Sequence, residues 1–330
     1  MVNIFSFDNH LMLLTGAHRV LVDIHNALRD EFHSVIVGTI PYDKVNPVLG
    51  IEKGDYIQLK SVFQLRNSIL FLHQRRWAVL FNVLNKILFL HSTVIYVHHN
   101  ILKGHKKKSL FPDHIITISD SCVQNLTEYF GVPLSRIIKI HNAVPDISPA
   151  EHRPWQGGKI KILYPASISH VKRQLQIYGH LKNHLSQDIE IIFAGSGEEY
   201  EKLNNLTRHD PRFTCLGFVE NIKELLANVD YCMLFSEYEG LPIALIEATM
   251  MGVPIICNDV GGNLEVAKNG YNALICNNWS QLISCLDSLQ RISLDEYSLL
   301  SRNSRLHYLE NFTYDRFKES YINYIRKLGL

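Results

Sequence analysis

Long apolar runs and paired cysteines are absent from this sequence of 330 residues. No run of about 18 uninterrupted apolar residues occurs, so no membrane-spanning helix is expected. None of the six cysteines forms a Cys-x-x-Cys pair, which excludes zinc ribbons and thioredoxin-type motifs and favours buried free thiols. The N-terminus lacks the basic start of a secretory signal peptide. We therefore expect a cytoplasmic chain.

Other missing patterns narrow the chemistry. No Gly-x-Gly-x-x-Gly opens a strand–helix unit, which argues against an enzyme that binds NAD. The 17 histidines include no His-Glu-x-x-His spacing, so a zinc hydrolase of that type is not expected. The formal net charge of +1 argues against a globally basic nucleic-acid binder.

The composition is that of an ordinary globular protein, with 46% hydrophobic and 20% charged residues. The length suggests two domains. Short apolar runs alternate with helical patterns, which predicts α/β domains with parallel sheets. The expected strands are 3–7, 34–39, 57–60, 68–73, 93–98, 114–118, 161–165, 190–194, 213–216, 231–235 and 254–257. The expected helices are 17–31, 75–90, 121–130, 174–185, 198–204, 221–227, 243–251 and 264–269, followed by three C-terminal segments that end with 315–327.

A segment with two prolines and two glycines, 146–159, is predicted to link the two domains. Doubly wound α/β domains bind ligands outside the carboxyl ends of their strands. Polar residues at those strand ends are therefore the candidates for function.

The most informative block is 236–254, which follows the strand that ends at Phe235. A short loop carries Glu239, and Pro242 suits the first turn of the next helix. The N-terminus of such a helix can hold a diphosphate, with Glu239 close to hydroxyls beside it and Glu247 able to bind a ribose. The spacing alone also fits a surface loop and an ordinary amphipathic helix. However, an unpaired carboxylate at Glu247 would be costly within an apolar string.

This block, Glu-Gly-Leu-Pro-x4-Glu-Ala-x3-Gly-x-Pro, resembles the Glu-x7-Glu signature of retaining GT-B glycosyltransferases of family 4, the glycosyl transferases group 1. Residues 194–198, 216–219, 261–265 and 269–274 resemble the same family. The resemblance is strongest over residues 160–275 and weaker, but continuous in order, before them. It implies a GT-B fold of two facing Rossmann-like domains with a donor cleft between them.

By this resemblance, residues 1–148 form an acceptor-binding domain and residues 149–312 a nucleotide-sugar-binding domain. The last helix, 313–330, packs back on the N-terminal domain. The resemblance makes Glu239 the residue that contacts the donor sugar near the reacting carbon, and Glu247 the ligand of the nucleotide ribose. The adjoining loop residues Gly240, Leu241 and Pro242 are expected to bind the donor as well.

The family carries an Arg-x4-Lys pair that meets the diphosphate, and this sequence departs from it. Lys172 matches the lysine, but Ser167 stands where the arginine is expected. Arg173 and His170 are the candidates to replace that arginine; the alternatives are a slower enzyme or one with an unusual donor. No Asp-x-Asp motif, which would carry a divalent cation, lies at a strand end. Lys172 and the helix dipole are expected to neutralise the diphosphate, so we predict no metal and no other cofactor.

Two segments of the first half carry the resemblance further. The loop at Gly16 resembles the family's Gly-Gly-Ala-Glu-Arg loop, with Thr15 in place of one glycine, and a small residue lets backbone approach phosphate there. The family also places a histidine that contacts the donor sugar where His98 and His99 occur. The following small polar residue favours His99, but the spacing leaves both open. His73 ends the preceding strand and is a candidate for the acceptor side.

Acidic residues are missing between positions 56 and 112, where nine Lys and Arg occur. Cations beside apolar and aromatic residues suit an anionic bilayer surface. The residues expected at a membrane or acceptor surface are Arg75, Arg76, Lys103, Lys106, Lys107 and Lys108. The alternatives are that the helix over 77–90 belongs to the domain core, and that the lysines form a solvated loop or bind a soluble anionic acceptor.

Together these observations predict a retaining glycosyltransferase that moves a hexose-type sugar from a nucleotide sugar, with UDP favoured over GDP. The expected acceptor is a glycan or a lipid-linked molecule in bacterial surface polysaccharide or lipopolysaccharide assembly. The enzyme would work in the cytoplasm, peripherally on the inner face of the membrane. The alternatives are a non-catalytic subunit that binds nucleotide sugars, and a phosphorylase or epimerase of GT-B fold.

Overall fold

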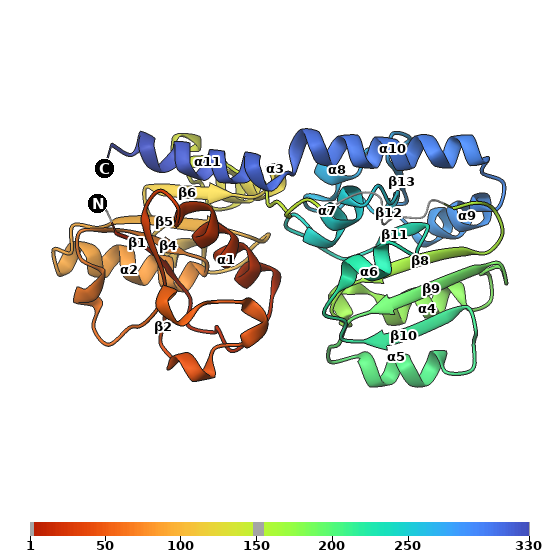
Figure 1. Cartoon of the computed structure of the whole chain (residues 1–330), viewed down its shortest axis with the longest axis horizontal. Coiled ribbons are helices and arrows are strands. Elements are labelled where there is room, and N and C mark those ends of the chain that lie inside the picture. Colours follow the sequence, from red (N-terminus) through yellow and green to blue (C-terminus); the bar gives the residue numbers. More distant parts are fainter. Residues whose placement is uncertain (1–2, 148–154, 330) are drawn as a thin grey trace. The chain divides into compact units, whose positions relative to one another are not determined.

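The computed structural model describes residues 3–147 and 155–329 and divides the chain into two compact units. The N-terminal unit comprises Met1–Asn142 and Tyr314–Leu330, and the C-terminal unit comprises Ala143–Thr313. Each unit contains one parallel β-sheet with helices packed against it (Figure 1). Residues 148–154 of the linker predicted at 146–159, and the domain boundary predicted after residue 148, lie outside the described residues.

The N-terminal unit is built on a seven-stranded parallel sheet of order β3-β2-β1-β4-β5-β6-β7. Its strands are β1 (Asn3–Phe7), β2 (His33–Gly38), β3 (Tyr56–Gln58), β4 (Ser68–Leu72), β5 (Thr93–His98), β6 (His114–Thr117) and β7 (Ile137–Lys139). Strand order reverses between β1 and β4, because the chain builds outward from β1 on one side and then returns to its other side. In doubly wound folds this is the point at which ligands bind.

Among the described residues, the α-helices that accompany this sheet are α1 (Gly16–Leu28), α2 (Arg75–Ile87), α3 (Asp120–Gln124) and α11 (Tyr314–Lys327). Thr15 begins α1 as its N-cap, and its hydroxyl accepts the backbone N–H of His18 at 3.4 Å. The helix predicted at 121–130 divides into α3 and a π-helical turn over Asn125–Tyr129. The apolar spacing of the sequence does not encode this wider turn.

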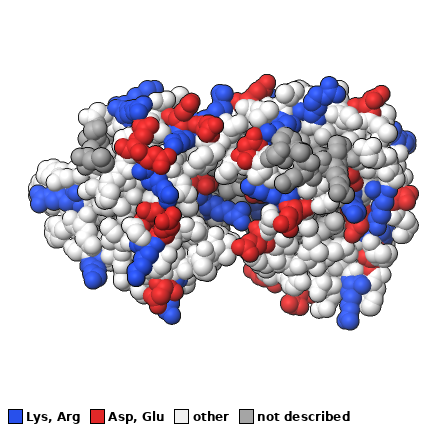
Figure 2. Space-filling view, viewed as in Figure 1, with Lys and Arg blue, Asp and Glu red and all other residues white. Residues whose placement is uncertain are grey.

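The last helix, α11, packs against α1 within the N-terminal unit, and the two lie side by side in Figure 1. Its apolar face buries Phe317 and Tyr321, while Lys318 and Arg326 pair with acids of the α1 region. Figure 2 shows such acidic and basic side chains next to one another on this face of the unit. Exposed ion pairs add little stability, so the buried aromatic residues hold α11 in place.

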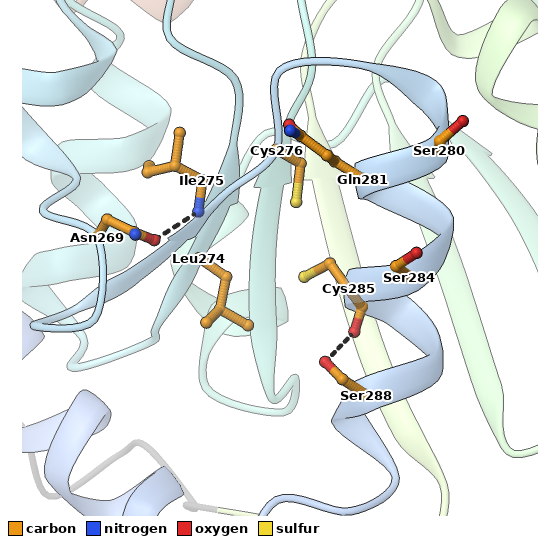
Figure 3. Close-up of a pocket in the computed structure, with 9 residues that line it drawn as sticks. All are labelled: Asn269, Leu274, Ile275, Cys276, Ser280, Gln281, Ser284, Cys285 and Ser288. Carbon is orange, nitrogen blue, oxygen red and sulfur yellow. Dashed lines mark hydrogen bonds between the residues drawn. The ribbon is translucent and has the colours of Figure 1, made fainter.

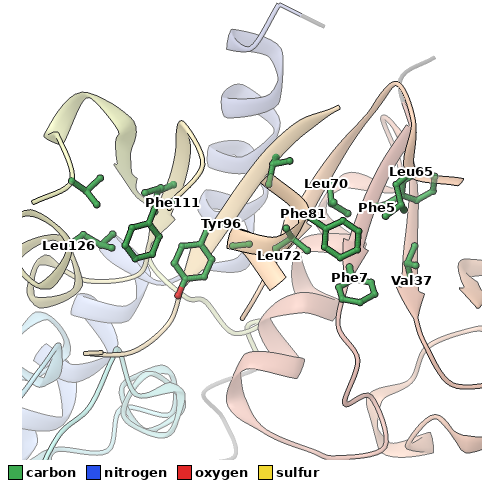
Figure 4. Close-up of a cluster of buried hydrophobic side chains, with 14 of the residues drawn as sticks. Phe5, Phe7, Val37, Leu65, Leu70, Leu72, Phe81, Tyr96, Phe111 and Leu126 are labelled. Atoms are coloured by element: carbon green, nitrogen blue, oxygen red, sulfur yellow. The ribbon is translucent and has the colours of Figure 1, made fainter. Parts of the chain in front are cut away.

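Alternation along the strands builds the core of the N-terminal unit. Phe5 and Phe7 of β1 lie on one face of the sheet, where they pack with Leu70, Phe81 and Tyr96 (Figure 4). The strands therefore read as nearly continuous apolar runs because both faces of the sheet are covered.

The C-terminal unit has a six-stranded parallel sheet of order β10-β9-β8-β11-β12-β13. Its strands are β8 (Ile160–Pro165), β9 (Ile189–Ala194), β10 (Phe213–Gly217), β11 (Tyr231–Leu234), β12 (Ile255–Cys257) and β13 (Ala273–Ile275). Its helices are α4 (Gln174–Leu181), α5 (Tyr200–Thr207), α6 (Ile222–Leu226), α7 (Ile243–Met250), α8 (Asn263–Val266), α9 (Trp279–Leu289) and α10 (Leu294–Asn311). The order reverses between β8 and β11, so the loops after these two strands mark the expected ligand site.

Most predicted elements occur within a few residues of their expected limits, but β7 and β13 were not predicted. Both are three-residue strands at the edge of their sheet. Among the described residues, no helix combines the length and the apolarity that crossing a bilayer requires.

Candidate functional site

The loops after β8 and β11 are tied together by a buried tyrosine of the C-terminal unit. The hydroxyl of Tyr164 donates to the carbonyl of Lys172 at 2.6 Å and accepts the N–H of Phe235 at 2.9 Å. Glu237 donates its backbone N–H to the carbonyl of Val171 at 2.8 Å. Burial raises the pKa of Tyr164, so the hydroxyl keeps the proton it donates. These bonds fix the two loops against one another.

This arrangement brings Lys172 and Glu239 together although they lie 67 positions apart in sequence. The Nζ atom of Lys172 is 2.5 Å from Oε1 of Glu239, and their side chains are 22% and 8% exposed. A buried carboxylate is costly unless it is paired, and this ammonium supplies the partner. Two residues that the sequence analysis assigned to the donor site therefore form one ion pair at the reversal point of the sheet.

Helix α7 begins directly after this loop. Pro242 was expected in the first turn of this helix, but it is the N-cap residue, one position before that turn. The proline carbonyl accepts backbone N–H groups of Leu245 at 3.1 Å and Ile246 at 3.3 Å. Gly240 and Leu241 lie between Glu239 and this cap. The positive end of the α7 dipole therefore lies at the end of the Glu239 loop.

The Gly261-Gly262 pair, which the sequence analysis noted as family-like, packs on the same loop. Gly262 donates its N–H to the carbonyl of Gly240 at 2.8 Å. Gly261 has a φ of +55°, and a Cβ atom there would lie 1.8 Å from the carbonyl oxygen of Glu239. Only glycine permits this approach, so the pair sets the path of the Glu239 loop.

Glu247 lies within α7 and is buried, as are its helix neighbours Ile246 and Ala248. Glu239 and Glu247 therefore occupy different elements, a loop and a helix, as predicted from the pattern. The burial of a carboxylate in an apolar helix favours a functional or structural polar role over a solvated surface position.

The arginine position of the family pattern is taken by Ser167, which is exposed. Its two proposed substitutes both lie beside Glu237. Nε2 of His170 and Nε of Arg173 are 3.5 Å and 3.6 Å from Oε1 of Glu237, and the guanidinium of Arg173 lies 6.0 Å from the centre of the Phe235 ring. Glu237 was not singled out in the sequence analysis, although its place two residues before Glu239 made it visible.

At the reversal point of the N-terminal sheet, Asp8 follows β1 and anchors a polar cluster. Its carboxylate accepts the N–H of His10 at 2.7 Å and the side-chain amide of Gln74 at 3.0 Å. Nε2 of His18 lies 3.5 Å from Oδ1 of Asp8. Burial alone would raise the pKa of Asp8, but the bonds from His18 and His10 outweigh it and hold the pKa below its ordinary value. The carboxylate is therefore ionised.

His73 and His99 form the second half of this cluster. Nδ1 of His73 lies 2.9 Å from Nε2 of His99, and the rings are nearly parallel. Burial lowers the pKa of His73 to about 4 and holds the pKa of His99 well below its ordinary value. Both imidazoles are thus neutral near pH 7, and a single N–H joins them.

The two adjacent histidines at the end of β5 have different surroundings. His98 Nδ1 lies 3.0 Å from the hydroxyl of Tyr96, and its ring packs edge-on against that tyrosine. His99 instead joins the cluster that contains Asp8 and His73. Successive residues of a strand point to opposite faces of the sheet, so the two rings lie apart. The sequence spacing alone could not show which of the two joins the cluster.

Gly16 is the first residue of α1, and Thr15 at the expected glycine position caps that helix. Thr15 Oγ1 also lies 3.2 Å from Nδ1 of His18, so it helps orient the histidine beside Asp8. Neither Asp8 nor His18 was predicted as a site residue. Asp8 could have been predicted, because it is a polar residue directly after a strand and such residues face the ligand site.

The predicted basic surface also lies on the N-terminal unit. Arg75 donates to the carbonyl of Gly104 at 3.0 Å, and Lys103, Lys107 and Lys108 are exposed. The guanidiniums of Arg75 and Arg76 lie within 6 Å of the rings of Phe130 and Trp77, and the ammonium of Lys106 is 5.8 Å from the ring of Tyr129. Arg75, Arg76 and Lys106 therefore each lie against an aromatic side chain.

Helix α2 belongs to the core only on one face. Ala78 and Phe81 are buried, whereas Ile87 is 64% exposed and Phe89, just after the helix, is 69% exposed. Within residues 3–147 and 155–329, no group of three or more His, Cys, Asp or Glu side chains is arranged to hold a metal ion.

Comparison with known proteins places these features in context. Residues 150–305, which include Lys172, Glu239 and Glu247, match the family model of glycosyl transferases group 1. The Escherichia coli O-antigen biosynthesis glycosyltransferase WbnH is 27% identical over 197 residues, which are 56% of this chain and 56% of that protein. The Escherichia coli UDP-Gal:alpha-D-GlcNAc-diphosphoundecaprenol alpha-1,3-galactosyltransferase is 27% identical over 157 residues, 44% of this chain and 40% of that one. The chain spans about half the length of the curated relatives it matches.

Among solved structures, Anabaena HepE in complex with UDP-glucose superposes with a TM-score of 0.83. The match covers 99% of this chain and 100% of that chain at 15% sequence identity. The chain has the GT-B fold. This confirms the predicted fold class, since each GT-B unit is a Rossmann-like α/β domain with a parallel sheet, and at this identity the match concerns the fold alone.

Proposed function

We propose that this GT-B chain is a retaining glycosyltransferase that moves a hexose-type sugar from a UDP-sugar to a glycan or lipid-linked acceptor. The process would be the assembly of bacterial surface polysaccharide or lipopolysaccharide. The observation that carries the proposal is the Lys172–Glu239 ion pair at the β8/β11 reversal point, within the segment that matches the glycosyltransferase family.

The donor site is proposed around this pair. A nucleoside diphosphate brings negative charge, which suits the ammonium of Lys172 and the N-terminus of α7. When the donor binds, Lys172 exchanges the carboxylate of Glu239 for diphosphate oxygens. Glu239 is then free to accept hydrogen bonds from the hydroxyls of the sugar. Glu247, on the helix, is proposed to bind the ribose.

The choice of UDP rests on similarity. The solved HepE structure contains UDP-glucose, and one Escherichia coli relative carries UDP-Gal in its name. The two named Escherichia coli relatives also link the family match to O-antigen synthesis and to a lipid-linked acceptor.

The reaction proposed is a front-face substitution. The acceptor oxygen bonds to the anomeric carbon on the face from which UDP departs, and the leaving phosphate takes the acceptor proton. Lys172 and α7 stabilise the charge that develops on that phosphate, so no metal is invoked.

The histidine pair of the N-terminal unit is proposed to contact sugar hydroxyls. The buried Nε2 of His73 has no hydrogen-bond partner among the described residues. A neutral imidazole can donate to or accept from a hydroxyl without placing a second charge beside Asp8. His99, which His73 orients, is the residue proposed to act next to the anomeric centre.

Membrane association is proposed for the surface formed by Arg75, Arg76, Lys103, Lys106, Lys107 and Lys108. Cations near an anionic bilayer attract it, and the exposed Ile87 and Phe89 add apolar surface on the same helical segment. An enzyme held in this way would meet a lipid-linked acceptor at the cytoplasmic face of the membrane.

A panel of UDP- and GDP-sugars tests the proposal, first by thermal shift and then by turnover with lipid-linked and glycan acceptors. A bound donor raises Tm in proportion to ln(1 + [L]/Kd), so the correct donor should stand out. Transfer with retained anomeric configuration is the expected result. Binding without turnover on any acceptor would favour a non-catalytic subunit, and a product formed without acceptor would favour an epimerase or phosphorylase.

A further inference from the structure

A cavity of about 420 Å³ lies beside α9 and β13 in the C-terminal unit, and two cysteines line it. Cys276 directly follows β13, and Cys285 lies on α9. Figure 3 shows both sulfur atoms in the space between the helix and the strand. The donor loops contribute no residue to this cavity lining, so it is distinct from the proposed donor site.

The two thiols interact directly. A hydrogen bond between their side chains lowers the pKa of Cys276 and raises the pKa of Cys285. The Cys285 S–H therefore stabilises a Cys276 thiolate, as in dithiol sites that react with disulfides. Cys232 and Cys257 differ, because burial raises the pKa of each thiol and neither lines this cavity.

The local fold holds the pair in place. Cys276 donates its backbone N–H to the carbonyl of Cys257 at 2.8 Å, which anchors it to the sheet. The side chain of Asn278 caps α9 by accepting the N–H of Gln281 at 2.9 Å. The short connection between a fixed strand end and a capped helix therefore keeps Cys276 and Cys285 near one another in the folded chain.

We propose that Cys276 and Cys285 are a reversible modification site that reacts with small-molecule disulfides entering this cavity. The Cys276 thiolate attacks one sulfur of the disulfide, and the first leaving thiolate takes up a proton. Cys285 then loses its proton and attacks the Cys276 sulfur of the mixed disulfide, which releases the second thiolate. Two protein thiols are oxidised, and one small disulfide is reduced to two thiols.

A disulfide between Cys276 and Cys285 would act on α9, the helix that packs against the start of the Glu239 loop. Trp279, the first residue of α9, packs on Phe235 at 4.8 Å between ring centres and on His180 at 4.2 Å. Phe235 begins the loop that leads to Glu239. A disulfide fastens α9 to the end of β13 and restricts the position of this contact, and the inference does not depend on glycosyl transfer.

The full chain, reduced and then incubated with oxidised glutathione, provides the test. Intact mass should fall by two hydrogen atoms, peptide mapping should place the disulfide between Cys276 and Cys285, and dithiothreitol should reverse it. A disulfide restricts the unfolded chain, and the loop it closes here is short, so Tm should rise by a modest amount, roughly 5–10 °C. Cys285→Ser should instead hold one glutathione on Cys276, since the resolving thiol is gone.

Cys215→Ser supplies the matched control, because Cys215 is half-buried like Cys285 but, unlike Cys285 and the buried Cys276, does not line the cavity. That variant should form the same internal disulfide as wild type. The proposal is overturned if both thiols of the folded wild type stay reduced, if glutathione remains on Cys285, or if Cys285→Ser takes up no glutathione at Cys276.

Discussion

The Lys172–Glu239 ion pair and the burial of Glu247 give Glu239 and Glu247 different chemical surroundings. Glu239 faces a cation at the loop, whereas Glu247 lies inside an apolar helix. A carboxylate paired with an ammonium is suited to release that partner when a diphosphate arrives. A carboxylate fixed in a helix is suited to steady hydrogen bonding.

Substituting each glutamate should therefore have a different effect. Glu239→Gln should lower kcat by about 100-fold or more, because it removes charge beside the reacting centre, while UDP affinity changes little. Glu247→Ala should weaken UDP binding as well. Steady-state kinetics and calorimetric titration with UDP measure both.

Glu237→Gln is the matched control for Glu239→Gln, since Glu237 lies two residues earlier and pairs with His170 and Arg173 instead. It should retain most of the wild-type kcat. If Glu239→Gln and Glu247→Ala both keep wild-type kcat/KM, the assignment of the site is wrong.

The buried histidines should make the folded chain sensitive to mild acid. The pKa of His73 is about 4 when folded, against 6.5 in an unfolded chain, so the unfolded state binds protons first as pH falls below 6.5. Stability should thus be unaffected above that pH and fall between 6.5 and 4, by about 2 kcal/mol for His73 by pH 5.

Urea unfolding at pH 7.5 and pH 5 measures this effect in wild type and in His73→Gln. The variant lacks the titrating ring, so its free energy of unfolding should change less between the two pH values. Equal changes in wild type and variant would show that His73 does not titrate as its burial implies.

At the residue scale, Lys172 and Glu239 could be proposed as donor-site residues from the sequence because each belongs to a contiguous motif. The sequence could not predict that they form an ion pair, since that contact depends on the order of β8 and β11. The cluster around Asp8 joins residues that follow three different strands with one from helix α1, so no single motif contains it. The separation of His98 from His99 needed the register of β5.

At the scale of elements, the path of the Glu239 loop is set by a helix and by a neighbouring backbone. Pro242 is the N-cap of helix α7, and Gly261 lies against the carbonyl of Glu239. The loop is therefore held from both ends and from the side. A change that displaces its backbone should act on function more than on folding.

Gly261→Ala tests this, because a Cβ there would clash with the Glu239 backbone. It should lower kcat/KM by roughly 100-fold, since displacement by about 1 Å can cost that much. Gly270→Ala is a matched control, because Gly270 also has a positive φ, +72°, but open space around it. Gly270→Ala should lose only about 1–2 kcal/mol of stability, because alanine is strained in the left-handed backbone conformation.

Kinetics and thermal unfolding of the two glycine variants distinguish the effects. Equal losses of kcat/KM in Gly261→Ala and Gly270→Ala would mean that the close approach to Glu239 does not shape the site.

The basic segment after β5 should carry membrane binding. Replacing Lys103, Lys106, Lys107 and Lys108 by Ser should reduce sedimentation with anionic liposomes, since each cation contributes about 1 kcal/mol near an anionic surface. Binding should also weaken as salt rises. The control variant changes four lysines of the C-terminal unit to Ser, namely Lys182, Lys202, Lys223 and Lys268. Equal recovery of wild type with neutral and anionic liposomes would contradict a membrane role.

At this scale the sequence predicted most helices and strands, because apolar spacing and strand-end polarity are local signals. It did not predict β7, β13 or the π-helical turn at Asn125–Tyr129. These elements are short and depend on neighbours in the fold. Pro242 likewise marked the start of α7 but not its cap position, which differs by one residue.

For the whole molecule, the order of strands in the two sheets is the property that matters most. In each unit the candidate site residues lie where the strand order reverses: the cluster around Asp8 in the N-terminal unit, and the Lys172–Glu239 pair in the C-terminal unit. The family-like motifs were confined mostly to the C-terminal unit, and they allowed the GT-B fold to be predicted for the entire chain. The packing of α11 on α1 joins segments nearly 300 positions apart, which a local pattern cannot show.

The central claim is that the Lys172–Glu239 site binds a nucleoside diphosphate, and calorimetric titration of UDP into three proteins tests it most directly. Lys172→Ala removes a charge-assisted contact of roughly 1.5–3 kcal/mol, so its Kd for UDP should be about 10- to 150-fold higher than that of wild type. Lys202→Ala, which removes an exposed lysine of α5, should leave Kd unchanged. UDP binding of equal affinity in wild type and Lys172→Ala would contradict the account.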